Sequence, residues 1–186
     1  NPLDAVRDND RRQLRKRYTL GASFTWEIID NLKFRTEEGL DYYDNTDDRF
    51  YGITTYYVKN TPTATYQNKP ALETTENKSN TIRSTNTLNY DFKKFLGNTD
   101  HSVKILVGQE VIVENSNTLF NQVWNFPELF TSDQAYKLVG RGFSNIYRDT
   151  YNPDDKLLSF FGRLNYDFKN RYLFTATFRA DGSSIF

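Results

Sequence analysis

The strictest pattern in the chain is the alternation of apolar and polar side chains in "NRYLFTATFRADGSSIF", residues 170–186. Tyr172, Phe174, Ala176 and Phe178 fall on one side of an extended strand. The positions between them, from Arg171 to Arg179, are mostly polar. This period predicts a β-strand with one apolar face and one wet face, and any fold for this chain must provide both environments.

The same two-residue period returns in five further segments, so we expect six antiparallel strands with short and long connections in alternation. The first short turn is expected at Asp30 and Asn31, and the last at Lys169 and Asn170. The polar stretch before Tyr18 is expected to be a loop or a frayed end. The expected strands cover approximately residues 18–29, 32–43, 80–93, 101–113, 157–168 and 171–181, with long loops at 44–79 and 114–156.

Composition supports β-structure and excludes several functions. Only 37% of residues are apolar while 16% are aromatic, which favours strands with a wetted face over a helical bundle. Lys plus Arg equals Asp plus Glu at 24 each, so no net field favours nucleic acid as a partner. The chain has no Cys and one His, which removes thiolate chemistry and makes zinc an unexpected cofactor. We therefore expect a protein that is not an enzyme and has no metal or other cofactor.

Two architectures fit the alternation. Strands joined by short and long connections in turn are typical of a transmembrane β-barrel, with short periplasmic turns and long extracellular loops. A soluble β-sandwich, such as a lectin-like binding module, is the alternative, because it also needs one apolar and one wet face on each strand. We expect an all-β, antiparallel up-and-down transmembrane barrel segment, with about six strands of a larger barrel. Aromatic residues near the short turns favour the barrel, since they would form an interfacial girdle: Tyr90, Phe92, Phe95, Tyr166, Phe168 and Tyr172.

In a large barrel the wet face lines the interior, where charged side chains keep their hydration. Five polar residues of the last two expected strands are therefore candidates for the lumen wall. A polar network that holds neighbouring strands in register is the structural alternative for the same residues. The candidates are Arg163, Asn165, Asp167, Arg179 and Asp181.

Three stretches carry a family resemblance. "LLSFFGRLNYDFKNRYLFTATFRADGSSIF" resembles the strand-turn-strand signature of SusC/RagA-type TonB-dependent outer-membrane transporters. "HSVKILVGQEV" and "NLKFRTEEGLDYYD" are similar to other strands of that family, and their order along the chain agrees with it.

The resemblance implies that residues 1–186 are a partial barrel domain from a barrel of about 22 strands. Members of the family have a plug and a segment that contacts the TonB complex, neither of which is expected in this chain. The implied function is active uptake of a bulky nutrient, such as an oligosaccharide or a peptide, across the outer membrane of a Gram-negative bacterium. A SusD-like surface lipoprotein and outer-membrane lipid are the implied partners.

The long expected loops hold the remaining candidates. Tyr56, Tyr57, Tyr66 and Trp124 can stack on sugar rings or contact the lipoprotein, although packing within the loops is the simpler and favoured explanation. The acidic run from Asp41 to Asp48 can bind calcium, although it lacks the spacing of an EF-hand.

Overall fold

The computed structural model describes residues 2–61, 65–92 and 100–184. Its strands form one seven-stranded sheet, and the helices among the described residues are short. None of those helices has the length and apolar character needed to cross a membrane. The elements in chain order are α1 (Pro2–Arg7), β1 (Asn9–Ile29), β2 (Leu32–Tyr51), α2 (Tyr56–Lys59), β3 (Ala71–Asp91), β4 (His101–Trp124), α4 (Ser132–Lys137), the 3₁₀ helix η1 (Val139–Arg141), β5 (Phe143–Tyr151), β6 (Asp155–Phe168) and β7 (Tyr172–Ser183).

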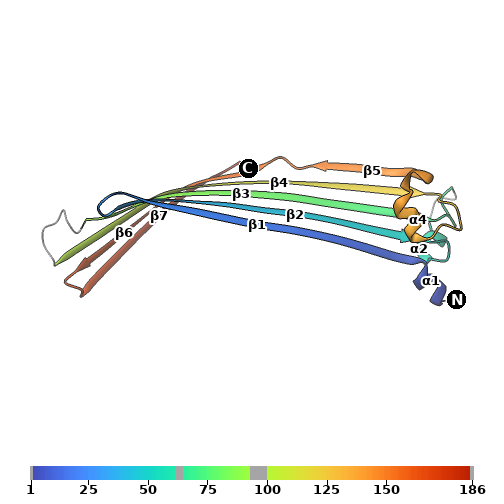
Figure 1. Ribbon diagram of the computed structural model, residues 1–186, viewed down its shortest axis with the longest axis horizontal. Coiled ribbons are helices and arrows are strands. Elements are labelled where there is room, and N and C mark those ends of the chain that lie inside the picture. The colour runs from blue at the N-terminus through green and yellow to red at the C-terminus, as the bar shows by residue number, and fades with distance from the viewer. Residues whose placement is uncertain (1, 62–64, 93–99, 185–186) are drawn as a thin grey trace. The chain divides into compact units, whose positions relative to one another are not determined.

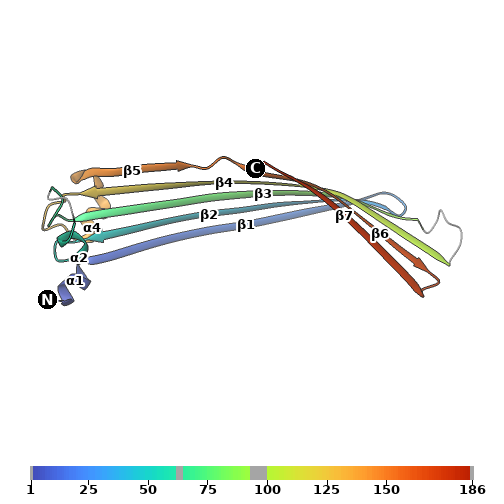
Figure 2. The same ribbon diagram turned by 180° about the vertical axis from the view of Figure 1, so that it is seen from behind.

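The strands follow one another across the sheet in the order β1-β2-β3-β4-β6-β7, and β5 also pairs with β4 (Figures 1 and 2). Sequential neighbours therefore pair, as expected for an up-and-down sheet. The described strands all belong to this one sheet, whereas the β-sandwich alternative requires two. The all-β, antiparallel up-and-down fold is confirmed.

Two of the expected short turns are confirmed by the backbone. Asn31 has φ 69°, and Lys169 and Asn170 have φ 55° and 52°. Two successive residues with positive φ define a type I′ turn, whose twist matches that of the strands it joins. Most of the connection between β3 and β4, including the expected girdle residue Phe95, lies outside the described residues.

The strands are longer than their sequence pattern predicted. The end of β2, the start of β3 and the end of β4 occupy much of the two predicted loops, 44–79 and 114–156, and β5 lies inside the second one. The stretch before Tyr18, predicted as a loop, is strand from Asn9 onward. These parts of the chain are rich in Asp and Asn, which have low strand propensity, and in Thr, which is polar, so they give no apolar period. Pairing with the neighbouring strands makes them strands all the same.

The chain divides into two compact units, and each of β1 to β4 contributes to both. Unit 1 comprises residues 1–17, 43–79 and 116–152, and unit 2 comprises residues 18–42, 80–115 and 153–186.

Unit 2 is a two-faced sheet without a covering layer among its described residues. The register aligns Ile105 of β4, Leu164 of β6 and Ala176 of β7 on one face. On that face Phe160, Phe174 and Phe178 are all more than half exposed, and Phe178 reaches 69%. The opposite face is polar, and the hydroxyl-bearing Ser159 is fully buried there. An uncovered apolar face of this kind requires an apolar environment outside the chain.

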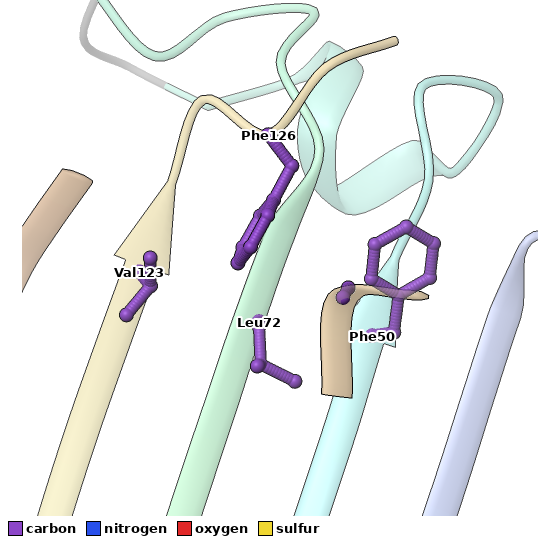
Figure 3. Close-up of a cluster of buried hydrophobic side chains, with 5 residues drawn as sticks. Phe50, Leu72, Val123 and Phe126 are labelled. Carbon is purple, nitrogen blue, oxygen red and sulfur yellow. The ribbon is translucent and has the colours of Figure 1, made fainter. Parts of the chain in front are cut away.

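Unit 1 contains every buried apolar side chain of the described residues. One cluster joins Phe50 of β2, Leu72 of β3 and Val123 of β4 to Phe126 and Ala135 of the segment that carries α4 (Figure 3). These contacts cover one side of three neighbouring strands.

The position of α4 is fixed by polar contacts as well. Its first turn has a capping box, in which Thr131 and Gln134 satisfy each other's backbone N–H groups. Arg12 of β1 donates a hydrogen bond to Asp133 at 3.0 Å, and its guanidinium lies 4.2 Å from the centre of the Tyr136 ring. The Tyr136 hydroxyl donates to the backbone carbonyl of Asp10 at 3.1 Å. These contacts tie the helix to β1.

One close contact on the polar face of unit 2 gives a stability prediction. A methyl group added to Gly108 would lie 2.3 Å from Cζ of Phe161, so the ring must move. We expect Gly108→Ala to cost about 1–3 kcal/mol, the usual range for overpacking, and to lower the thermal unfolding temperature of the purified protein. Gly162→Ala is the matched control, since its methyl group meets only the Leu106 carbonyl oxygen at 3.6 Å. An equal loss in both variants would contradict the prediction.

Candidate functional site

The structure brings the four aromatic loop candidates together at one hollow of about 420 Å³ in unit 1. Tyr56 and Tyr57 begin α2, Tyr66 lies in the connection that follows it, and Trp124 ends β4. The remaining wall consists of amide and hydroxyl side chains, from Asn60, Thr61, Gln122 and Asn145. We call this space the aromatic hollow.

Three of the four aromatic residues are held in a stack. The Tyr57 ring lies 4.1 Å from the Tyr51 ring and 5.7 Å from the Trp124 ring, centre to centre, and Tyr66 lies 5.5 Å from Trp124. Trp124 is only 3% exposed and packs with Val58 and Ala71 as well. For these three residues, packing within unit 1 explains the aromatic character.

Tyr56 differs from the other three because its side chain is free to contact a ligand. It is 80% exposed, and its ring makes no aromatic contact within the described part of the chain. It also lines a second hollow of about 480 Å³ in unit 1, together with Tyr57, Tyr51, Thr55 and Arg49. Tyr56 therefore borders both hollows.

A hydrogen-bond network centred on Glu73 supports the stack. The Tyr51 hydroxyl donates to one carboxylate oxygen of Glu73 at 3.0 Å, and the Tyr57 hydroxyl donates to the other at 2.7 Å. The Gln122 side-chain amide also donates to Glu73, at 2.7 Å, and its oxygen accepts from Asn145 at 2.8 Å. These residues come from β2, α2, β3, β4 and β5, so the network fixes the geometry of the hollow across five elements.

Tyr57 is uncharged in this setting. Burial raises the pKa of the Tyr57 hydroxyl, and the hydrogen bond to the Glu73 carboxylate raises it further. A raised folded-state pKa means that this stabilisation is complete below the ordinary tyrosine pKa of about 10 and is lost as the pH rises above it. At neutral pH the hydroxyl therefore stays a hydrogen-bond donor to Glu73.

Two of the expected lumen-wall candidates take part in one cross-strand network in unit 2. Arg179 of β7 donates to Glu110 of β4 at 3.0 Å, to Ser159 of β6 at 2.9 Å and to Asp181 at 2.8 Å. Glu110 also accepts a hydrogen bond from Thr85 of β3, at 3.3 Å. The geometry matches the register-holding alternative, while contact with a solute stays a prediction.

The other three candidates share that face but not that network. Asn165 accepts a hydrogen bond from Thr175 at 3.1 Å, and Asp167 accepts one from the backbone N–H of Asn170 in the turn, at 2.8 Å. Arg163 lies opposite Thr177 in the register.

The acidic run lies on strand β2 and not in a loop, so that part of the sequence interpretation is wrong. Asp48 accepts a hydrogen bond from Thr74 at 2.7 Å, and Asp47 pairs with Arg11, whose Nε lies 2.8 Å from its Oδ1. No cluster of three or more His, Asp or Glu side chains within the described ranges has the arrangement of a metal site. Calcium at this run stays an untested prediction.

Sequence reasoning missed the polar half of the hollow. Gln122 is 49 residues from its partner Glu73 and 23 residues from its partner Asn145. All three are ordinary polar residues in regions that were predicted to be loops. Only knowledge of which strands are neighbours could have found them.

The geometry first defines the class of protein. Unit 2 is a stretch of up-and-down barrel wall, with one apolar and one polar face. In unit 1, the segment that carries α4 packs on β2, β3 and β4. Comparison with known proteins extends this. No family model matches the chain. It is 30% identical over 178 residues, 92% of its length, to TonB-dependent receptor P3 of Formosa agariphila. It is 61% identical over 36 residues, 19% of its length, to TonB-dependent receptor SusC of Bacteroides thetaiotaomicron.

Solved structures agree on the fold. The structure of the RagAB peptide transporter matches all of this chain with a TM-score of 0.80 at 17% identity. The RagAB peptide importer in its "open-open" state matches with a TM-score of 0.78. This chain spans 16% of the P3 receptor, 4% of SusC and 19% of the RagAB chain. The chain belongs to the SusC/RagA type of TonB-dependent transporters and corresponds to a part of their barrel.

The Glu73 network yields a prediction for unit 1. Glu73→Ala leaves two tyrosine hydroxyls and one amide without their acceptor, and we expect a loss of about 2–4 kcal/mol in local stability. Amide hydrogen exchange of residues 51–60 measures this loss directly. Glu76→Ala on the same strand is the control, because Glu76 accepts a hydrogen bond from Lys78 in an exposed pair and none of the tyrosine donors contacts it. Unchanged exchange at residues 51–60 would show that the stack does not depend on Glu73.

Proposed function

We propose that the chain is part of the wall of an outer-membrane β-barrel in a Gram-negative bacterium, within a TonB-dependent active transporter. The transporter imports a bulky nutrient such as an oligosaccharide or a peptide. The single observation that carries this proposal is the uncovered apolar face of unit 2 in a chain of the SusC/RagA type.

The length of the apolar face supports a membrane-spanning role. On β6 the apolar positions run from Leu158 to Phe168, and on β1 from Tyr18 to Ile28. A tilted strand needs about 9–11 residues to cross the hydrocarbon core, and both stretches have this length. The rest of β1 toward Asn9 is polar, which fits a strand that continues beyond the membrane.

The proposed partners follow from the relatives. SusC and the RagAB complex support a SusD-like lipoprotein that covers the extracellular end of the barrel. The connections of unit 1 are proposed to be extracellular, because the short turns of the family lie on the periplasmic side. We assign energy transfer from the TonB complex to other parts of the protein, and no chemical reaction to this chain.

The aromatic hollow is the proposed solute contact. Aromatic side chains with amide groups around them recognise ligands that have both an apolar face and polar edges. Sugar rings and aromatic or proline side chains of peptides both have this character.

A cysteine scan tests the proposed environment of the two faces. The chain has no Cys, so each introduced cysteine is the only thiol among residues 1–186, and cysteines elsewhere in the complete protein are first replaced by serine. We expect lipid-phase labelling at the apolar positions Leu158, Phe160, Leu164 and Tyr166, and labelling by a water-soluble maleimide at Ser159, Arg163, Asn165 and Asp167. Intact cells and isolated outer membranes provide the two preparations. Aqueous labelling of both faces, or protection of the apolar positions in a water-soluble protein, would contradict the membrane assignment.

A further inference from the structure

Tyr56 and its neighbour Tyr57 border two hollows of unit 1, and we call these two residues the Tyr56 ridge. Tyr56 lines the aromatic hollow on one side and the second hollow on the other, and Tyr57 beside it does the same. The two volumes, about 420 and 480 Å³, fall within the range of small-ligand sites, which is about 300–1,000 Å³. Because Tyr57 is locked in the stack, Tyr56 is the residue of the ridge with a ring available for a new contact.

Among the described residues, the wall of the aromatic hollow has no Asp, Glu, Lys, Arg or His side chain. Its polar groups are the side chains of Asn60, Thr61, Gln122 and Asn145 and the tyrosine hydroxyls. The nearest carboxylate of the network, Glu73, already accepts hydrogen bonds from three donors. A ligand with a net charge finds no opposite charge in this wall, whereas hydroxyl groups find amide donors and acceptors.

Trp124 lines the same wall with the apolar part of its ring. Its indole Nε1 is buried and has no hydrogen-bond acceptor within the described part of the chain. A buried N–H without a partner is unusual, because leaving it unpaired costs about 1–3 kcal/mol.

The second hollow has a different character. Arg49 is the one charged residue in the described part of its wall. The Arg49 guanidinium lies 5.0 Å from the centre of the Tyr51 ring and donates to Asn9 at 3.3 Å. Guanidinium donors bind hydroxyl and ether oxygens as well as anions. This hollow therefore also fits a polyhydroxylated unit.

We propose that the Tyr56 ridge binds two consecutive units of an uncharged oligosaccharide, one in each hollow, with a sugar ring stacked on Tyr56. A sugar ring combines an apolar face of C–H groups with a rim of hydroxyls, which matches an exposed aromatic ring surrounded by amides. Peptides carry charged termini and side chains, for which the described wall of the aromatic hollow has no charged partner. The inference rests on the proposed function for the origin of the ligand.

The test uses the complete protein in detergent on an array of three ligand classes. These are neutral hexasaccharides of glucose, xylose and mannose in several linkages, uronic-acid oligosaccharides, and hexapeptides. We expect the wild-type protein to retain at least one neutral oligosaccharide. The dissociation constant for that oligosaccharide should be about tenfold larger in Tyr56→Ala. A disaccharide of the retained sugar should bind more tightly than the monosaccharide.

Tyr147→Ala is the matched control. Tyr147 is also a tyrosine of unit 1 and is 65% exposed, but it borders neither hollow. Both variants should keep the wild-type thermal unfolding temperature, since neither ring is buried. The proposal is overturned if no neutral oligosaccharide is retained, if only acidic oligosaccharides or peptides are retained, or if Tyr56→Ala binds like the wild type.

Failure here is separable from failure of the proposed function. Tyr56-dependent binding together with aqueous labelling of both faces of β6 would keep the ridge and reject the barrel wall. The expected labelling together with Tyr56-independent binding would keep the barrel wall and reject the ridge.

Discussion

Backbone hydrogen bonding between neighbouring strands is the interaction on which the rest of this structure depends. It fixes which side chains share a face, because each of residues 101–112 on β4 has one partner on β6 and that partner has another on β7. Leu106 lies opposite Arg163, which lies opposite Thr177, on the polar face. These positions are only one residue along each strand from the apolar row of Ile105, Leu164 and Ala176. A register slip of one residue would move the whole apolar row to the polar face. The cross-strand bonds of Arg179 oppose such a slip on the polar side.

The sequence predicted the parts of the fold in which one face is apolar. The alternation in β6 and β7 is visible because Phe160, Leu164 and Phe178 stand between polar residues, and the turns are visible because Asn tolerates positive φ. Residues 44–51 and 71–79 gave no such signal, although both lie on strands. Apart from the buried Phe50, Tyr51, Ala71 and Leu72 at the ends of these stretches, their residues are polar on both faces, so side-chain character carries no period. These segments are strands because they pair with neighbouring strands. The residues of one segment do not show which strands will be its neighbours.

The site shows the same division in more detail. Residue type was sufficient to select Tyr56, Tyr57, Tyr66 and Trp124 as a set, and the structure gathers all four at one hollow. Residue type could not show that three of them hold the fold while Tyr56 stays exposed. That distinction depends on ring distances and on the acceptor Glu73, which are properties of the assembled sheet. The two explanations offered from the sequence, packing and ligand contact, therefore apply to different members of the set.

Glu38 shows how the sheet accommodates an exception to its own rule. It shares a side of β2 with Phe34 and Leu40, so alternation within that strand makes a carboxylate look misplaced. The Thr36 hydroxyl donates to Oε1 of Glu38 at 3.0 Å, and the hydroxyl of Ser84 on β3 donates to the same oxygen at 2.8 Å. In the proposed membrane position, two donors would offset part of the cost of removing this carboxylate from water, and acidic residues on the lipid face of barrels cost less than basic ones. A polar residue within an apolar row is thus tolerated where the adjacent strand supplies its partner, and register decides whether it does.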